Sequence, residues 1–521
     1  MLNSMNIQAL YQLIRQNIPL ERAHFKLIQL KKTNYTLAQL GALAISLQLR
    51  AGRNSSEEDL LQFIIDTSIP IRQYLQQLDD LSTPLGKTSR KIPLKRSEME
   101  ALLHGYLVND VDDCYMAMWL MIVVYRGLVN KEVSDMTDIM SNSGAVYDYR
   151  NVAELECRKI IRRYPTGGVS EKIALIMPSL IAAFAEQYPI ASNFLVARSL
   201  GHTGGTWDKL SVIPGFHFPA QGRETLNILK RHHVAMSVTS ADCNPLDNRL
   251  YQLRSATGSV VSLPLITASI ASKLRVLPVD FTLLDVRYGE DVFAQNIEEG
   301  RHLGSEILKL IQRDMEGDFL LTEVLQPDGM GIGNKLEVME ALSIMKNDLN
   351  NTRWNEKALE EQKNLLIKMF KLMMQRVFPL IDLSSLEGQI REAFSNGRVL
   401  SGFKRLLLSH GVSESDAVAL IDNPEILLEK YVGHFIYAKQ AGVLKKIDLK
   451  KIGLFVNFDL ITGLNTFAPA ENNGAGVILQ VRLGDQIVEG DVLCEVIALP
   501  EYILHHKNKI EEKLAHSFII E

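Results

Sequence analysis

The sequence predicts an α/β protein with added helical and α+β parts. Three observations support this fold class. Apolar residues recur at three- and four-residue spacing through residues 1–80, which is typical of amphipathic helices. From about Arg158, short apolar runs alternate with helical patterns, as they do in a sheet covered by helices. Strand and turn patterns then dominate residues 476–493, so a smaller α+β part should follow.

The length and composition bound the function classes. At 521 residues with 46% hydrophobic content, the chain can form several domains with large cores. The formal net charge is −5, from 56 basic and 61 acidic residues, so we expect neither a nucleic-acid nor an anionic-membrane partner. The four cysteines (Cys114, Cys157, Cys243 and Cys494) show no CxxC spacing. This distribution fits a reducing compartment and predicts neither a disulfide framework nor a metal site.

The hydrophobic pattern favours a cytoplasmic protein. The first residues lack the charged, apolar and small-residue succession of a signal peptide. The longest apolar run, Met116–Tyr125, is about half of the roughly 20 residues that a membrane-spanning helix needs. We therefore expect this run to form a buried helix.

An internal repeat lies in the N-terminal region. The segment Leu40–Arg50 has a near copy at Met116–Arg126, an offset of 76 residues, and the flank Glu21–Ile28 falls over Ser97–His104 at the same offset. Each copy predicts a small helical bundle around a central helix that is apolar nearly all round. Between the copies, residues 82–89 have the composition of a linker.

Two glycine-rich loops are the candidate ligand-binding segments. One spans residues 199–216 and follows the apolar run 194–197, and the other spans residues 163–169. Small residues let a ligand approach the backbone, and free N–H groups suit an anion. Because each loop follows a predicted strand, the two could close around a phosphorylated or glycosidic ligand.

The longer loop also carries a family signature. The string LGHTGGTWDKL (residues 200–210), followed by IPGF (residues 213–216), resembles the signature of the thymidine and pyrimidine-nucleoside phosphorylases. The resemblance extends over roughly residues 95–500, and AMP phosphorylases and anthranilate phosphoribosyltransferases are related to the same family. It implies a helical domain, a large α/β domain with a central mixed sheet, and a small C-terminal α+β domain.

This resemblance gives the expected domains and partners. Members of the family usually dimerise through the helical part, so we expect a homodimer. The duplicated bundle could extend that surface, cover it, or recruit another protein. The expected domains are an extra N-terminal helical bundle (1–81), a phosphorylase-type helical domain (90–152, completed by 243–278), an α/β domain with the ligand cleft (153–428) and a C-terminal α+β domain (429–521).

The resemblance implies that three residues contact the pyrimidine. Arg254, Ser269 and Lys273 match, position for position, the residues with which the family contacts the base. Ser269 and Lys273 are four residues apart and share one helix face. The departing base gains negative charge, which cations and donors stabilise. Arg254 and Lys273 would therefore reach the two carbonyls and Ser269 the N3 position.

The phosphate half departs from the family pattern. Where the family reads Lys-His-Ser-Thr-Gly-Gly-Val, this chain has Tyr164 for the histidine and Pro165, which has no N–H donor, for the serine. Two further family serines fall at Ala174 and Val196. Tyr164 and His202 would lie near the sugar. The groups left to bind phosphate are Arg163, Thr166, Gly167, Gly168, Thr206 and Lys209.

Three functions remain open. The first is pentosyl transfer from a pyrimidine nucleoside or nucleotide to phosphate, which would be a co-substrate in a reaction without cofactors. Arg198 would then join Arg163 in a rebuilt phosphate pocket. The second is a catalytically silent nucleoside-binding paralogue with a regulatory or scaffolding role. The third is hydrolysis, with Glu290 or Asp291 as the base. These two carboxylates replace small family residues and would repel an anion or pair with an arginine.

Overall fold

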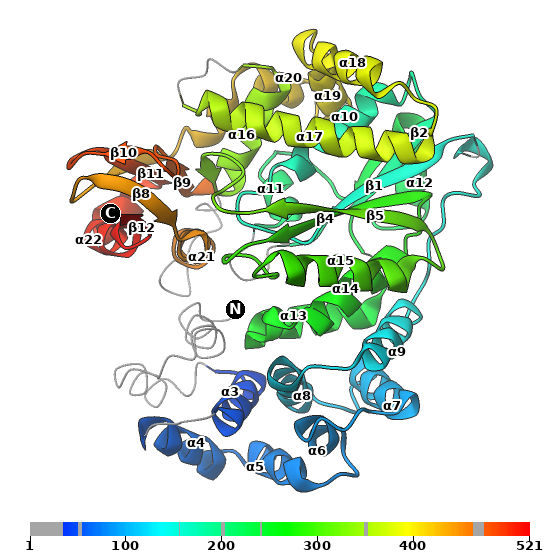
Figure 1. The fold of residues 1–521 in the computed structure, drawn as a ribbon, viewed down its shortest axis with the longest axis vertical. Helices are drawn as coiled ribbons and strands as arrows, with labels where there is room; N and C mark the ends of the chain where they lie inside the picture. Colours follow the sequence, from blue (N-terminus) through cyan, green and yellow to red (C-terminus); the bar gives the residue numbers. More distant parts are fainter. Residues whose placement is uncertain are drawn as a thin grey trace. The chain divides into compact units, whose positions relative to one another are not determined.

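The computed structural model describes residues 35–50, 55–155, 157–198, 204–239, 242–348, 353–461 and 474–521. The chain divides into two compact units. The helical unit comprises Met1–Val146 and Ser240–Val276, and the sheet unit comprises Tyr147–Thr239 and Leu277–Glu521. Figure 1 labels their elements.

The helical unit joins two distant stretches of sequence. Helix α14 packs on α9, and α13 packs on α7 and α8. Local signals start the helices: Thr36 forms a capping box with Gln39, and the Asp112 side chain accepts from the Tyr115 N–H. The described elements are α3 (Leu37–Leu49), α4 (Ser55–Thr67), α5 (Ile69–Gln76), η2 (Gln77–Asp79), α6 (Pro84–Ser89), α7 (Arg96–Leu107), α8 (Asp113–Arg126), α9 (Asn130–Ser141), α13 (Pro245–Thr257), η4 (Ser259–Val261) and α14 (Leu263–Arg275).

The described part of the repeat confirms both predicted central helices. The offset of 76 residues carries α3 onto α8 and α4 onto α9, within two residues at each end. Both α3 and α8 are buried along most of their length. The flank Glu21–Ile28 lies outside the described residues.

The predicted linker at residues 82–89 is wrong, because helix α6 occupies most of it. Thr83 caps the helix by accepting from the Gly86 N–H, and Pro84 has the fixed φ that suits a first helical position. The Trp119 indole N–H donates to Thr88 Oγ1 at 3.0 Å. Although residues 82–89 have the composition of a linker, most of them form a capped helix that packs on α8.

The sheet unit contains a five-stranded sheet in the order β3-β2-β1-β4-β5. The prediction of a mixed sheet is wrong, because every neighbouring pair is parallel. Helices connect successive strands, so the chain returns to the same edge before each strand begins. The strands are β1 (Lys159–Pro165), β2 (Ile190–Leu195), β3 (Val234–Ser237), β4 (Phe281–Tyr288) and β5 (Glu316–Glu323).

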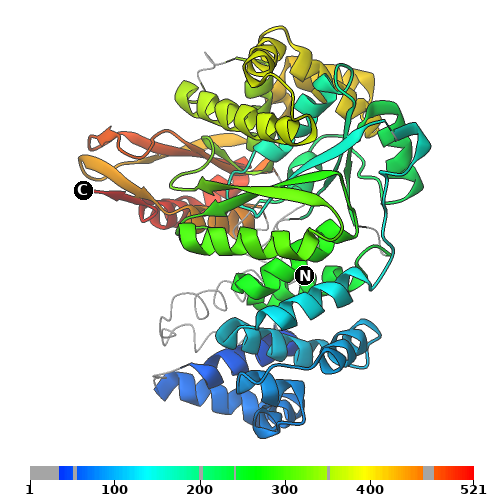
Figure 2. The same cartoon turned by 45° about the vertical axis from the view of Figure 1, so that its right-hand side comes forward.

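Helices cover both faces of this sheet. Figures 1 and 2 show α15 on one face and α17 on the other. Buried aromatic side chains such as Phe184, Phe370 and Phe394 fill the core beside α17. The elements are η3 (Ala153–Leu155), α10 (Ile173–Phe184), α11 (Thr206–Leu210), α12 (Arg223–His232), α15 (Ile297–Ile311), α16 (Asn334–Met345), α17 (Glu356–Val377), α18 (Leu383–Ser395), α19 (Arg398–Ser409), α20 (Glu414–Asp422) and η5 (Pro424–Leu428).

The C-terminal part has the predicted α+β character. Two antiparallel sheets have the orders β10-β8-β12 and β6-β9-β11-β7. Strand β6 consists of Gly331 and Ile332, which come just before α16 in the sequence. The elements are β6 (Gly331–Ile332), β7 (Val432–Tyr437), β8 (Gly442–Ile447), α21 (Leu449–Leu454), the π-helix η6 (Phe455–Leu460), β9 (Gly476–Leu479), β10 (Gln486–Ile487), β11 (Val492–Ala498), α22 (Pro500–Ala515) and β12 (Phe518–Ile520).

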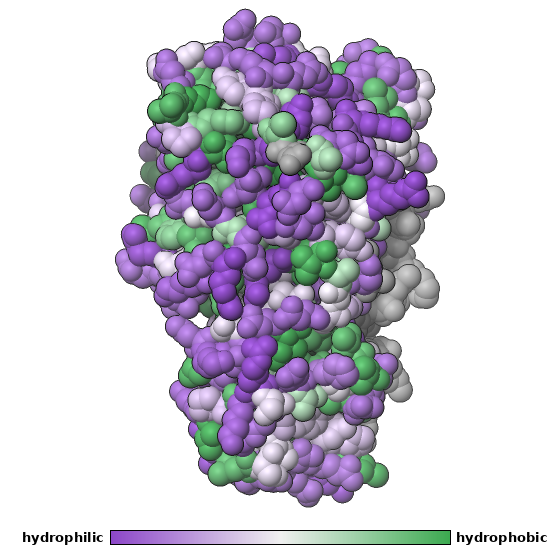
Figure 3. Space-filling view, turned by 90° about the vertical axis from the view of Figure 1, so that its right-hand side faces the viewer, coloured by the Kyte–Doolittle hydropathy of each residue, from purple (hydrophilic) through white to green (hydrophobic). Residues whose placement is uncertain are grey.

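Hydrophilic side chains dominate the face drawn in Figure 3, and apolar residues form small groups among them. Among the described residues, the helices are too short or too polar to span a bilayer.

Candidate functional site

The predicted base residues Ser269 and Lys273 interact directly on α14. Lys273 Nζ donates to Ser269 Oγ at 2.7 Å, which confirms that the two share one helix face. The same ammonium forms an ion pair with Asp247 of α13 and lies 4.8 Å from the ring centroid of Tyr251. All three polar side chains are buried. They form a compact group of buried polar side chains in which the ammonium of Lys273 is paired with the carboxylate of Asp247.

Burial sets the electrostatics of this group. Burial lowers the pKa of the Lys273 ammonium, and the carboxylate of Asp247 opposes this effect. The interaction of a cation with developing negative charge is stronger in such a medium than in water. Sequence reasoning missed Asp247. Its position seven residues before Arg254, two turns along one helix, was the available signal.

Arg254 connects α13 to the start of α14. Its guanidinium donates to the backbone carbonyls of Ser259, Val260 and Leu265 at 3.3–3.4 Å. Arg254 is buried, so these bonds hold the turn that leads into the helix of Ser269 and Lys273. Its contact with a base carbonyl stays a prediction.

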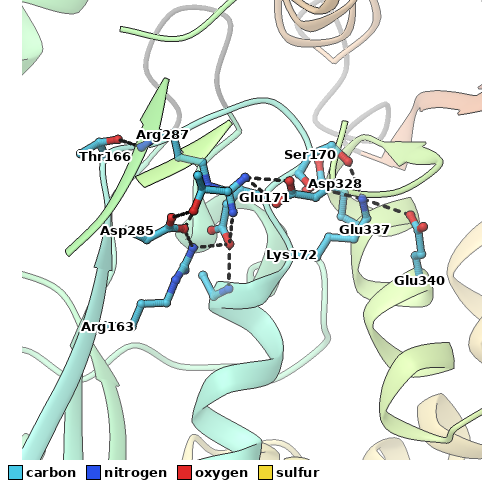
Figure 4. Close-up of polar contacts among 12 residues, drawn as sticks. Arg163, Thr166, Ser170, Glu171, Lys172, Asp285, Arg287, Asp328, Glu337 and Glu340 are labelled. Atoms are coloured by element: carbon cyan, nitrogen blue, oxygen red, sulfur yellow. Dashed lines mark hydrogen bonds and ion pairs between the residues drawn. The ribbon is translucent and has the colours of Figure 1, made fainter. Parts of the chain in front are cut away.

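The glycine loop at residues 163–169 contacts a cluster of buried charges. Arg163, at the end of β1, pairs with Asp285 of β4 and, at 2.9 Å, with Glu171 (Figure 4). Arg287 Nε donates to Asp285 at 3.0 Å, and its Nη1 contacts both oxygens of Asp328 at 2.6 and 2.7 Å. The predicted phosphate ligand Arg163 is thus already paired with two carboxylates.

The loop backbone is tied to the same cluster. Thr166 Oγ1 accepts from the Arg287 N–H at 2.9 Å, and the Thr166 N–H donates to the Asp285 carbonyl at 3.0 Å. Gly167 has a φ of +102°, which side chains rarely allow, so glycine is required there. Gly168 follows it and leads into the charge cluster.

Two lysines, Lys172 and Lys209, extend the cluster. Lys209 of α11 pairs with Glu337 at 2.7 Å and donates to the Glu171 carbonyl at 2.6 Å. Lys172 pairs with Glu340 at 3.0 Å, and Glu340 accepts from the N–H groups of Met330 and Gly331. Thr206 is the first residue of α11. In the part of the chain that the structure describes, four cations face five carboxylates, so these residues have no excess positive charge for a phosphate. The charged residues of the cluster are Arg163, Lys172, Lys209, Arg287, Glu171, Asp285, Asp328, Glu337 and Glu340.

The arginines shift the pKa values of the buried carboxylates. Burial alone would raise the pKa of Asp285, but Arg287 and Arg163 outweigh burial and lower the pKa to about 2. The same balance lowers the pKa of Glu171. Burial prevails at Asp328 and raises its pKa despite Arg287. The arginines thus favour the anionic forms of Asp285 and Glu171, whereas burial disfavours the anionic form of Asp328.

This shift predicts a loss of stability in acid. The pKa of Asp285 is about 2 in the folded protein, below its ordinary 3.8, so its contribution is present above about pH 4. The contribution is lost as the pH falls from about 4 to 2. Denaturant unfolding at a series of pH values should show the gap in unfolding free energy between wild type and Asp285→Asn narrowing over that window. A constant gap would contradict the assignment.

The other predicted residues have separate environments. Tyr164 is half-buried in β1, and Pro165 ends that strand. Ala174 and Val196 are buried. They place apolar side chains at two positions where the family that this chain resembles has serine. Arg198 lies over the ring of Trp207, 4.1 Å from its centroid. His202 lies outside the described residues.

The expected role of Glu290 and Asp291 needs correction. Glu290 pairs with Lys446, and Asp291 accepts from the Leu449 N–H, so the C-terminal domain engages both. The carboxylates that pair with arginines at the loop are Glu171, Asp285 and Asp328, which sequence reasoning missed. A charged residue inside the apolar run 281–286 was the one signal for Asp285. In the part of the chain that the structure describes, no three side chains are arranged to hold a metal ion.

Comparisons with known proteins matched a family model to part of the chain and relatives to most of it. Residues 158–374 match the glycosyl transferase family, a/b domain. The chain is 27% identical over 422 residues to the pyrimidine-nucleoside phosphorylase of Geobacillus stearothermophilus, covering 81% of this chain and 92% of the relative. It is 28% identical over 411 residues to that of Bacillus subtilis (strain 168), covering 79% and 90%. Anthranilate phosphoribosyltransferase from Thermus thermophilus superposes with a TM-score of 0.46 and 13% identity, over 63% of this chain and 98% of that chain.

Proposed function

Because this chain carries a glycosyl transferase family α/β domain and is related to pyrimidine-nucleoside phosphorylases over about four fifths of its length, we propose that it is a pentosyltransferase. It cleaves the glycosidic bond of a pyrimidine nucleoside or nucleotide and transfers the pentosyl group to phosphate. The observation that carries this proposal is the buried Lys273–Ser269 pair, held by Asp247.

The base residues supply the chemistry for the leaving group. Bond cleavage at C1′ leaves the electron pair on the pyrimidine, whose negative charge is delocalised onto its carbonyl oxygens. The ammonium of Lys273 is cationic and buried, so it stabilises this charge more in the transition state than in the ground state. While Lys273 donates to Ser269 Oγ, the Ser269 hydroxyl can donate its own proton to N3 of the pyrimidine. If Lys273 releases this bond, Ser269 Oγ can instead accept from an N3–H group.

The proposed binding site for phosphate, the acceptor of the pentosyl group, is less well supported than the proposed pyrimidine site. Arg163 Nε, Arg163 Nη1 and Arg287 Nη2 have no hydrogen-bond partner among the described residues. These donors support binding of an anion beside the glycine loop. Glu171 and Asp285 oppose it, so we expect a higher phosphate requirement than a cluster without carboxylates would have.

Free-base release tests the proposal. Purified full-length protein is incubated with thymidine, uridine, cytidine or their monophosphates, with and without phosphate, and the free base is measured by chromatography. Release that requires phosphate is the expected result. Release without phosphate would assign water as the acceptor, and absence of release from every substrate would overturn the enzyme assignment.

The buried carboxylates favour a second candidate, a nucleoside-binding protein that does not turn over its ligand. Among the described residues, five carboxylates face four cations, so the positive charge of the cluster is already offset without phosphate. This candidate predicts that a pyrimidine nucleoside raises the melting temperature while no base is released. Phosphate-dependent release would exclude it.

A further inference from the structure

Helices α3 and α8 are the central helices of the two sequence repeats, and they pack against each other. Both are buried over most of their length, including Leu43 and Ile45 of α3 and Met118 and Trp119 of α8. Helices that are apolar nearly all round need a covering partner, because such a surface is unfavourable in water. For α8, a large part of that cover is α3.

The register of this contact follows the repeat. A Cβ added at Gly41 would lie 2.8 Å from Cys114 Sγ and 3.0 Å from Met118 Cγ. These two residues flank Ala117, which is the repeat equivalent of Gly41. Further along, burial raises the pKa of the Tyr125 hydroxyl, and the neighbouring Ser46 hydroxyl opposes this effect.

The two contacts fix the relative direction of the helices. Ser46 follows Gly41 in α3, and Tyr125 follows Cys114 and Met118 in α8, so the helices run parallel. Tyr125 lies three residues beyond Ile122, the repeat equivalent of Ser46. Gly41 and Ser46 of α3 therefore each lie near α8 residues that are within about one helical turn of their repeat equivalents, Ala117 and Ile122. Two copies of one helix adopt this register around a two-fold axis parallel to them.

From this pseudo-symmetric packing we propose that α3 is a built-in partner for α8, which makes the full chain a monomer. The chain contains, as an intramolecular contact, the isologous pairing that two copies of a helical domain would otherwise form. The duplicated segment thus covers the α8 surface, one of the three roles left open by the sequence. The proposal differs from the expected homodimer and is independent of the proposed function.

Light scattering on the full chain after size exclusion is the first test. The expected mass is that of one chain, 58.5 kDa, at all concentrations. A mass of two chains would overturn the proposal.

Separating the helices provides the second test. Gly41→Leu adds a side chain where Cys114 and Met118 leave no space, so it should force α3 from α8. The uncovered α8 should then pair with a second copy, and the mass should rise toward two chains as concentration increases. The matched control is Gly388→Leu, on α18, where an added Cβ meets nothing within 4 Å. A folded Gly41→Leu protein that stays monomeric would overturn the proposal.

A smaller substitution covers the case in which Gly41→Leu does not fold. Gly41→Cys in a Cys157→Ser background places a thiol beside Cys114 and removes the exposed cysteine. After mild oxidation, a bridge within one chain is expected, with loss of two thiols and unchanged mass on a non-reducing gel. A bridge between two chains would show that α8 is covered by another copy and would overturn the proposal.

Discussion

Replacing Lys273 by methionine is expected to lower the rate of base release by at least about 100-fold, as removal of a preorganised donor for developing charge typically does. Methionine keeps much of the side-chain volume and removes the ammonium that contacts Ser269 and Asp247. The measurement is kcat for the best nucleoside in the chromatographic assay, corrected for the folded fraction.

The control separates catalysis from folding. Lys273→Met alone leaves the Asp247 carboxylate buried without its cation, which costs about 3–5 kcal/mol of stability. Adding Asp247→Asn removes that charge, so the double variant should regain stability while base release stays low. Lys131→Met, at a lysine whose side chain is 73% exposed, should change neither property. A folded double variant with the wild-type rate would contradict the role of Lys273.

Replacing Asp285 by asparagine should lower the free energy of unfolding by about 3–5 kcal/mol, because it leaves Arg163 and Arg287 buried with less compensating charge. Denaturant unfolding at neutral pH measures this loss. We expect the midpoint to fall while the slope of the transition is unchanged.

Asp318→Asn is the matched control for this variant. Asp318 lies on the neighbouring strand β5, opposite Leu283 of β4, and pairs with Arg376 at the surface. With side chains 40% and 58% exposed, this pair should contribute less than about 1 kcal/mol. Equal losses in the two variants would mean that the buried cluster does not stabilise the fold.

The sequence predicted those features that depend on local spacing. The 76-residue repeat predicted two central helices, and α3 and α8 occupy those positions. The four-residue spacing of Ser269 and Lys273 predicted one helix face, and their side chains are hydrogen-bonded. Helical periodicity and residue spacing are fixed by the helix itself, so no knowledge of distant neighbours is needed.

Features that depend on distant partners could not be predicted. Asp285 meets Arg163 because β4 lies beside β1, and that neighbourhood follows from the strand order. Asp247 meets Lys273 because two helices pack together. The apolar run around Asp285 indicates that this carboxylate is buried, but the sequence does not show which cation compensates its charge. The mixed sheet was expected from the family resemblance, whereas the neighbouring strands β3, β2, β1, β4 and β5 are all parallel.

The most direct test of the central claim is isothermal titration of thymidine and of a purine nucleoside, inosine, into the full chain and into the Lys273→Met/Asp247→Asn variant. The account predicts saturable binding of thymidine to wild type, at least about tenfold weaker binding to the variant, and no comparable binding of inosine, because loss of one charged hydrogen bond costs about 1.5–3 kcal/mol. Equal binding of thymidine to both proteins, or tighter binding of inosine, would contradict a pyrimidine site at Lys273.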